Sequence, residues 1–85
     1  MESGLEANAT LIRVDRVRLD SSLISEVAYD RATAVLEIKF HDGDVYAYFV
    51  VPRAVYEALV TAGSPGAFFH EHIDRRFGYE LRSSG

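Results

Sequence analysis

The stretch that decides the fold is VLEIKFHDGDVYAYFVVPRAVYEAL, residues 35–59. It begins with apolar residues that alternate with Glu37 and Lys39, the period of two expected of a half-buried strand. A tight-turn signal and a second run rich in β-branched and aromatic residues follow at once. Pro52 ends that run, because proline cannot donate to a strand ladder but suits a first helical turn. The stretch predicts a β-hairpin and then a helix that starts at Pro52 and buries one apolar stripe, Val55, Tyr56, Leu59 and Ala62.

The length of the hairpin loop decides which way Tyr46 and Tyr48 point. A two-residue loop at 42–43 places both tyrosines on the charged face of the hairpin, exposed to solvent. A three-residue loop at 41–43, with a bulge at Gly43, places them on the apolar face. We favour the three-residue loop, because it places Glu37, Lys39, Val45 and Ala47 together on the opposite, less apolar face of the hairpin. Both tyrosines are then core residues with hydroxyls at the rim.

The chain before the hairpin adds further strands. Residues 10–19, TLIRVDRVRL, alternate in the manner of an edge strand or an ordered arm, and their arginines Arg13, Arg16 and Arg18 would blunt an exposed edge. Residues 23–29 read as a strand that is closed by a turn at 30–33. Consecutive strands joined by short turns pair as antiparallel neighbours. The sequence therefore predicts a three-stranded antiparallel meander, with the N-terminal segment as a fourth, edge strand.

A second helix follows the first. Gly63 ends the first helix, and Ser64 followed by Pro65 is an N-cap and first-turn signal. The second helix is predicted to run to about Phe77-Gly78, with Phe69, Ile73 and Phe77 on one stripe against the sheet or the first helix. The fold class is thus α+β, a meander followed by two packed C-terminal helices. The predicted boundaries are a disordered tail at 1–10, one domain at 11–81, in which residues 79–81 return alongside the sheet, and a frayed end at 82–85.

Composition limits the functions that this chain can carry. Its 85 residues suit one small domain, and the net charge of −4 argues against strong, sequence-blind binding to nucleic acid. The absence of cysteine excludes disulfides and thiolate metal ligands and favours a reducing compartment, so we expect a cytoplasmic location. No apolar run reaches the roughly 20 residues of a membrane helix.

The residues now described resemble a known family, the KTSC domain, which also occurs at the C-terminus of some lysyl-tRNA synthetases. The resemblance covers residues 21–79 and centres on the tyrosine pair Tyr46-Ala47-Tyr48. Two positions depart from the family pattern, His70 where asparagine is expected and Ala28 where glycine is usual. The resemblance implies no established activity, and it suggests RNA binding only through the attachment to a tRNA-charging enzyme. The other matching segments are Asp20-Ser21-Ser22, residues 27–30, Phe40, Gly43, Val51-Pro52, Val55-Tyr56-Glu57, Leu59, Ser64-Pro65-Gly66, Phe68-Phe69 and Ile73.

Two functions follow as hypotheses. The first is weak RNA binding, single-stranded or tRNA, in which aromatic rings stack on bases and arginines hold phosphates. Its candidate residues are Tyr46, Tyr48, Arg53, Phe68, Arg75 and Arg76. The second is a protein-interaction or accessory module without a nucleic-acid role, which could self-associate through an exposed strand edge or through the side of the second helix that carries Phe68.

Catalysis and metal binding have little support in the sequence. His70 and Asp74 lie one helical turn apart, but two ligands do not make a metal site. Neither a nucleophile elbow nor a glycine-rich phosphate loop is present. We therefore expect no enzyme activity, no metal and no cofactor.

Overall fold

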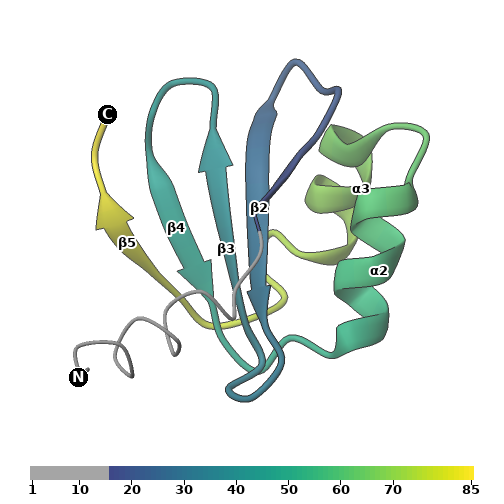
Figure 1. The fold of residues 1–85 in the computed structure, drawn as a ribbon, viewed down its shortest axis with the longest axis vertical. Coiled ribbons are helices and arrows are strands. Elements are labelled where there is room, and N and C mark those ends of the chain that lie inside the picture. Colours follow the sequence, from purple (N-terminus) through teal and green to yellow (C-terminus); the bar gives the residue numbers. More distant parts are fainter. Residues whose placement is uncertain (1–15) are drawn as a thin grey trace, which may run out of the picture.

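The computed structural model of this protein describes residues 16–85. The predicted tail at 1–10 and the start of the predicted N-terminal strand lie outside the described residues. The described chain forms five strands and two helices (Figure 1). Their order is β1 (Arg16–Arg18), β2 (Ile24–Asp30), β3 (Val35–Phe40), β4 (Val45–Tyr48), α2 (Arg53–Thr61), α3 (Pro65–His72) and β5 (Tyr79–Ser83).

The sheet is a continuous antiparallel meander in the order β1-β2-β3-β4-β5. The predicted three strands and the N-terminal edge strand are confirmed. The strand predicted at 23–29 is β2, which starts at Ile24, and β4 ends at Tyr48. The chain then returns from α3 to add β5 at the open edge of β4. This strand runs through Ser83, which lies opposite Val45 of β4, two residues beyond the predicted return at 79–81.

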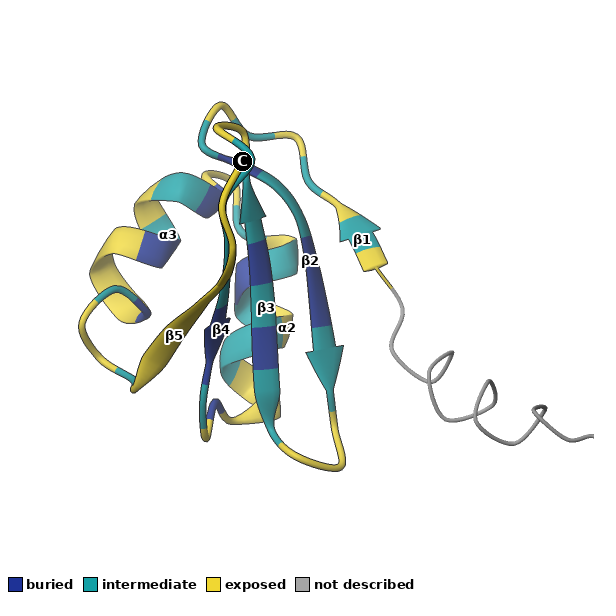
Figure 2. Ribbon diagram, turned by 90° about the vertical axis from the view of Figure 1, so that its left-hand side faces the viewer, coloured by how far each residue is buried: buried dark blue, intermediate teal, exposed yellow. Residues whose placement is uncertain are grey.

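Both helices lie on one face of the sheet, the inner face, which carries the core (Figures 1 and 2). The cross-strand partners Val27, Ile38 and Tyr46 follow one another across this face. They meet Leu59 of α2 and Phe69 of α3 in one cluster of buried and half-buried residues. Within residues 16–85, no helix lies over the opposite, outer face, which is built largely from charged and small residues.

The hairpin between β3 and β4 has the favoured three-residue loop. The backbone N–H of Phe40 donates to the carbonyl of Asp44 at 2.9 Å, and Gly43 has a φ of 99°. Glycine suits this left-handed conformation because it has no Cβ to clash. The resulting register sets Tyr48 opposite Leu36, on the inner face. The prediction that the tyrosine pair belongs to the apolar face is confirmed.

Both helix starts use the residues that the sequence indicated, with one difference. Ser64 caps α3, since its hydroxyl accepts from the backbone N–H of Ala67 at 3.4 Å, and Pro65 is the first helical residue. Pro52 keeps an extended conformation, with a ψ of 146°, and is therefore the N-cap of α2 instead of its first residue. On α2, only Leu59 is fully buried, and the other three residues of the predicted stripe are half-buried.

The second helix is shorter than predicted. It ends at His72, five residues before Phe77. The backbone N–H of Asp74 bonds back to the carbonyl of Phe69 at 2.8 Å, and Arg75 takes a left-handed φ of 65°. These two features turn the chain out of the helix. Ile73 is nevertheless buried and Phe77 is half-buried against the core, so the predicted stripe packs as expected.

Candidate functional site

The tyrosine pair was a candidate base-stacking platform, and it lies against the helices. Tyr48 is only 5% exposed, and its ring packs edge-on against Phe69 of α3, with the ring centres 5.8 Å apart. Tyr46 is half-buried and packs edge-on against Phe40 at 6.0 Å. Burial raises the pKa of the Tyr48 hydroxyl, and the nearby Asp74 carboxylate and the Tyr46 and Tyr79 hydroxyls raise it further. These properties fit a core role for Tyr48 and leave no open ring face there for a base.

Three of the candidate residues are arginines that the fold brings to one end of the molecule. Two backbone hydrogen bonds hold this end together, from Val51 N–H to the carbonyl of Ala34 and from Phe49 N–H to the carbonyl of Gly78, both 2.9 Å. They tie the β2–β3 turn and the α3–β5 segment to the chain that leads into α2, at the lower end in Figure 1. We call the arginines of these three segments the basic end; they are Arg31, Arg53, Arg75 and Arg76.

Sequence reasoning missed Arg31, because the turn at 30–33 lies more than 20 residues from the other three arginines. All four side chains belong to exposed residues. Arg53 Nε pairs with Glu57 Oε2 at 2.8 Å, one helical turn on, where both side chains are more than half exposed. Within residues 16–85, the other three arginines form no ion pair. Their charge is thus less compensated than that of Arg16 or Arg82, which both have carboxylate partners.

The N-terminus of α2 adds to the positive potential at the basic end. Pro52 offers no side-chain cap, and the first turn of α2 contains no acidic residue. The first N–H groups of a helix carry a partial positive charge when they lack an intrahelical partner. Arg53 stands at the first position of the same helix, so its guanidinium and the helix dipole favour an anion together.

The opposite end of the molecule is acidic. The β1–β2 turn and the β3–β4 hairpin meet there, because His41 N–H donates to the carbonyl of Leu23 at 3.0 Å (upper end in Figure 1). These two loops contribute Asp20, Asp42 and Asp44. These three aspartates thus lie at the opposite end of the strands from the basic end, although Asp30 and Asp74 stand directly beside Arg31 and Arg75 in the chain.

Phe68 belongs to α3 itself and not to the three segments that carry these arginines. It is half-buried in the middle of α3, and its ring centre lies 4.6 Å from that of His72 on the same helix. The two other histidine contacts on α3 are also local, with His70 Nδ1 3.6 Å from Asp74 Oδ2 and His72 Nε2 3.6 Å from Glu71 Oε1. Within residues 16–85, no three histidine, aspartate or glutamate side chains come together in a way that could hold a metal ion.

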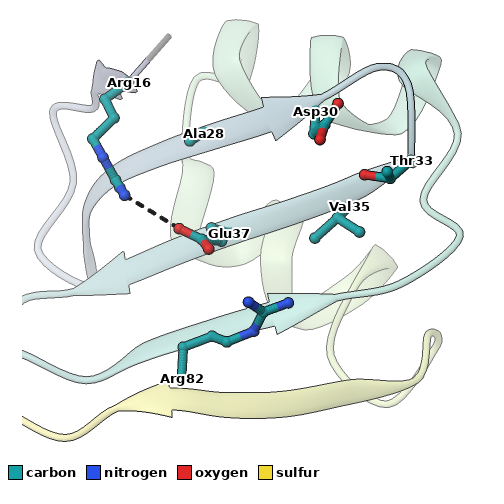
Figure 3. A pocket seen from close by; sticks show the side chains of 7 residues that line it. All are labelled: Arg16, Ala28, Asp30, Thr33, Val35, Glu37 and Arg82. Carbon is teal, nitrogen blue, oxygen red and sulfur yellow. Dashed lines mark hydrogen bonds and ion pairs between the residues drawn. The ribbon is translucent and has the colours of Figure 1, made fainter. Parts of the chain in front are cut away.

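The outer face of the sheet carries a shallow hollow of about 430 Å³ (Figure 3). Arg16 reaches across Ala28 to Glu37 at 3.2 Å, which explains why Ala28 is buried on a face without helices. Arg82 and Asp30 also border the hollow, so its positive and negative charges balance. A second hollow of about 420 Å³ lies where the Ser21 turn meets the start of α3.

Several residues that carry the family resemblance have structural roles. The Tyr29 hydroxyl donates to the carbonyl of Val51 at 2.6 Å, and its ring stacks on Tyr56 at 4.9 Å. The Ser21 hydroxyl accepts from the backbone N–H groups of Leu23 and Ile24 at 3.1 and 3.2 Å. These residues stabilise the turn and the junction between sheet and helix, which gives them a structural role in the fold.

The geometry thus defines a small α+β domain in which a meander is covered on one face by two helices. The KTSC domain profile matches residues 20–77, and the chain belongs to this family. In the comparison with solved structures, it is similar to a KTSC domain protein from Yersinia pestis, with a TM-score of 0.78 and 31% identity, covering 82% of this chain and 99% of that one.

Two sequence relatives show where such domains occur. A lysine–tRNA ligase from Trichormus variabilis is 43% identical over 64 residues, which is 75% of this chain and 11% of the ligase. An uncharacterised protein from Stutzerimonas stutzeri is 39% identical over 56 residues, which is 66% of this chain and 79% of that protein. The family thus occurs both as a small part of a large ligase and as a chain of its own size. Within the described part of the chain, no helix is long and apolar enough to cross a bilayer.

Proposed function

We propose that this domain is a non-catalytic, cytoplasmic module that binds RNA weakly by its phosphates, through the basic end. The observation that carries the proposal is the collection of Arg31, Arg53, Arg75 and Arg76 from three separate segments at one end of the molecule. Arginine is well suited to phosphate, because its planar guanidinium offers several donors in a fixed geometry. The occurrence of related segments within lysine–tRNA ligases supports RNA as the polyanion.

The local concentration of arginines also explains how a chain of net charge −4 could bind RNA. The aspartates of the acidic end lie at the far end of the strands, beyond the distance over which physiological salt screens charges, roughly 8 Å. An approaching strand would therefore be oriented with its phosphates toward the basic end. With few contacts, the affinity should be low and strongly dependent on salt.

The role of the tyrosines differs in this proposal from the stacking platform that their spacing first suggested. Tyr48 supports the inner face beneath α3, and Phe68 packs on its own helix. The binding energy would come mainly from phosphate contacts. Such binding distinguishes base sequences poorly, because phosphates carry no sequence information.

The test is a titration of the protein with a short unstructured RNA, followed by amide NMR shifts at low and then moderate salt. We expect shifts around residues 31, 53 and 75–76 that fade as salt rises. Replacing these four arginines together with glutamine should abolish binding. Replacing them singly should lower the slope of log affinity against log salt by about 0.7 for each single-strand phosphate that is no longer neutralised. Arg18→Gln is the matched control, since Arg18 is an exposed arginine on β1.

The proposal would be wrong if Arg18→Gln weakened binding as much as each change at the basic end. It would also be wrong if the wild-type protein gave no shifts at low salt. The four-arginine variant must keep the wild-type melting temperature, which separates a defect in binding from a defect in folding.

A further inference from the structure

Within residues 16–85, β5 is the longer and the more exposed of the two edge strands of the sheet. It is the last strand of the sheet, and all five of its residues are exposed. The strand at the other edge, β1, has only three described residues and is flanked by Arg16 and Arg18. Short, charged edges are protected against pairing with another chain, whereas a longer edge with apolar side chains invites it. Of the two edges that the described residues form, β5 therefore suits a partner strand better.

The inner face of β5 carries two exposed apolar side chains. Tyr79 is 59% exposed and Leu81 is 49% exposed, and they lie opposite Tyr48 and Tyr46 in the register with β4. Both rings of that pair contact Tyr79, with the ring centres 5.8 and 5.9 Å apart. The aromatic contacts of the core thus continue onto β5, whose residues are exposed along the whole strand (Figure 2). Such an apolar strip at a strand edge is typical of an interaction site.

The charges on the outer face of β5 identify the partner. Glu80 lies opposite Ala47 on this face. Arg82 has no partner on β4, because the register shifts between Leu81 and Ser83, but its side chain borders the outer-face hollow and so points the same way as Glu80. Arg82 Nε is 3.0 Å from Glu80 Oε2, and its guanidinium carbon is 5.9 Å from the centre of the Phe49 ring. One acidic and one basic residue therefore flank Leu81 symmetrically in the sequence YELRS.

This arrangement is self-complementary. If two copies of β5 pair antiparallel about a two-fold axis at Leu81, each Glu80 faces the Arg82 of the second copy, and the two leucines meet at the axis. Opposite charges that face each other across strands stabilise pairing, and like charges destabilise it. An interface that uses the same patch on both subunits must be self-complementary in this way.

We propose that β5 is a homodimer interface, in which antiparallel pairing of β5 with the β5 of a second copy joins the two sheets into one. The Tyr79 and Leu81 side chains of both copies would form a shared apolar strip on the inner face. Because the strands run in opposite directions, the two basic ends would lie at opposite ends of the dimer. The interface therefore leaves the proposed RNA contacts open, and the two proposals are tested separately.

The test uses charge reversal at the two complementary positions, with the molar mass in solution measured by sedimentation velocity over a range of concentrations. We expect the wild-type protein to dimerise as its concentration rises. In a homodimer of Glu80→Arg, arginine would face arginine at both cross-strand pairs. In a homodimer of Arg82→Glu, glutamate would face glutamate at the same pairs. Each variant should therefore remain monomeric.

The decisive sample is an equimolar mixture of these two variants. In the mixed pair every facing charge is again opposite, so we expect a heterodimer of about wild-type affinity. The double variant Glu80→Arg/Arg82→Glu should recover the homodimer for the same reason.

Two controls separate pairing from folding and from net charge. Glu71→Arg makes the same charge change on an exposed residue of α3 and should leave dimerisation unchanged. Leu81→Arg places like charges at the two-fold axis and should abolish dimerisation, while circular dichroism shows that the domain is folded. A wild-type protein that stays monomeric at all concentrations would overturn the proposal, as would single charge reversals that dimerise normally.

Discussion

Tyr48 and Tyr79 lie directly opposite each other on neighbouring strands and on the same face of the sheet, yet their environments differ. Tyr48 is 5% exposed and Tyr79 is 59% exposed, although their ring centres are only 5.9 Å apart. The difference comes from α3, whose Phe69 covers Tyr48 and does not reach the edge strand. The same residue type on one face is thus a core residue under the helix and a surface residue one strand further out. The position of a helix, and not the alternation of the strand, decides which role each tyrosine takes.

The largest expected difference is in the cost of truncating these rings. Tyr48→Ala should lower the free energy of unfolding by about 3–5 kcal/mol, because it removes a large buried aromatic ring and leaves a cavity beside Phe69. Urea denaturation followed by circular dichroism measures this loss. A folded variant with nearly wild-type stability would contradict the core role of Tyr48, and Tyr48→Phe serves as the control that keeps the ring.

Truncating Tyr46 should lower the unfolding free energy by less than truncating Tyr48 and by more than truncating Tyr79. Its half-buried ring packs against Phe40 and Tyr79, so Tyr46→Ala should cost about 2 kcal/mol of unfolding free energy. The same denaturation experiment tests this value. If Tyr46→Ala cost as much as Tyr48→Ala, the stability contributed by Tyr46, Tyr48 and Tyr79 would not depend on how far α3 covers each ring.

Alkaline pH should sharpen the comparison further. Burial and the Asp74 carboxylate raise the pKa of Tyr48 above its value in the unfolded chain, which is about 10. The folded state then holds a proton that the unfolded state loses, so stability is complete below about pH 10 and falls above it by about 1.4 kcal/mol per pH unit. Thermal unfolding of wild type and Tyr48→Phe between about pH 9 and 11 measures this effect; an equal decline in both would assign it to other groups.

The smallest effect is expected at the edge. Tyr79→Ala should change the unfolding free energy of the monomer by roughly 0.5 kcal/mol or less, because an exposed side chain loses little burial. The measurement belongs at a concentration where the protein is monomeric. A loss comparable to that of Tyr46→Ala would mean that the edge strand is part of the core.

Much of the fold follows from local signals in the sequence. The bulged hairpin at Gly43 and the capped helix start at Ser64-Pro65 are confirmed where they were predicted. Each depends on backbone geometry that a few neighbouring residues impose, such as a left-handed glycine or a hydroxyl that caps a helix. The period of two in β3 likewise assigned its inner and outer residues without knowledge of their partners.

Other features depended on contacts between distant segments. The extent of β5 was predicted only in part, because its pairing partner β4 lies more than 30 residues earlier in the chain. The early end of α3 depends on the turn at Asp74 and Arg75, where no glycine or proline signals a stop. For the candidate site, Arg53, Arg75 and Arg76 were singled out from sequence, but Arg31 joins them only through the hydrogen bonds that assemble the basic end.

The sequence alone determined the order and type of most elements, the face of each central strand and the family, because these depend on local periodicity, turn chemistry and characteristic spacing. Only the tertiary structure decided that Tyr48 is covered while Tyr79 is exposed, and that Arg31 joins the other arginines of the basic end. These features depend on where α3 docks and on how loops far apart in the chain meet. Packing and hydrogen bonds between distant segments set these positions, and no local sequence pattern encodes them.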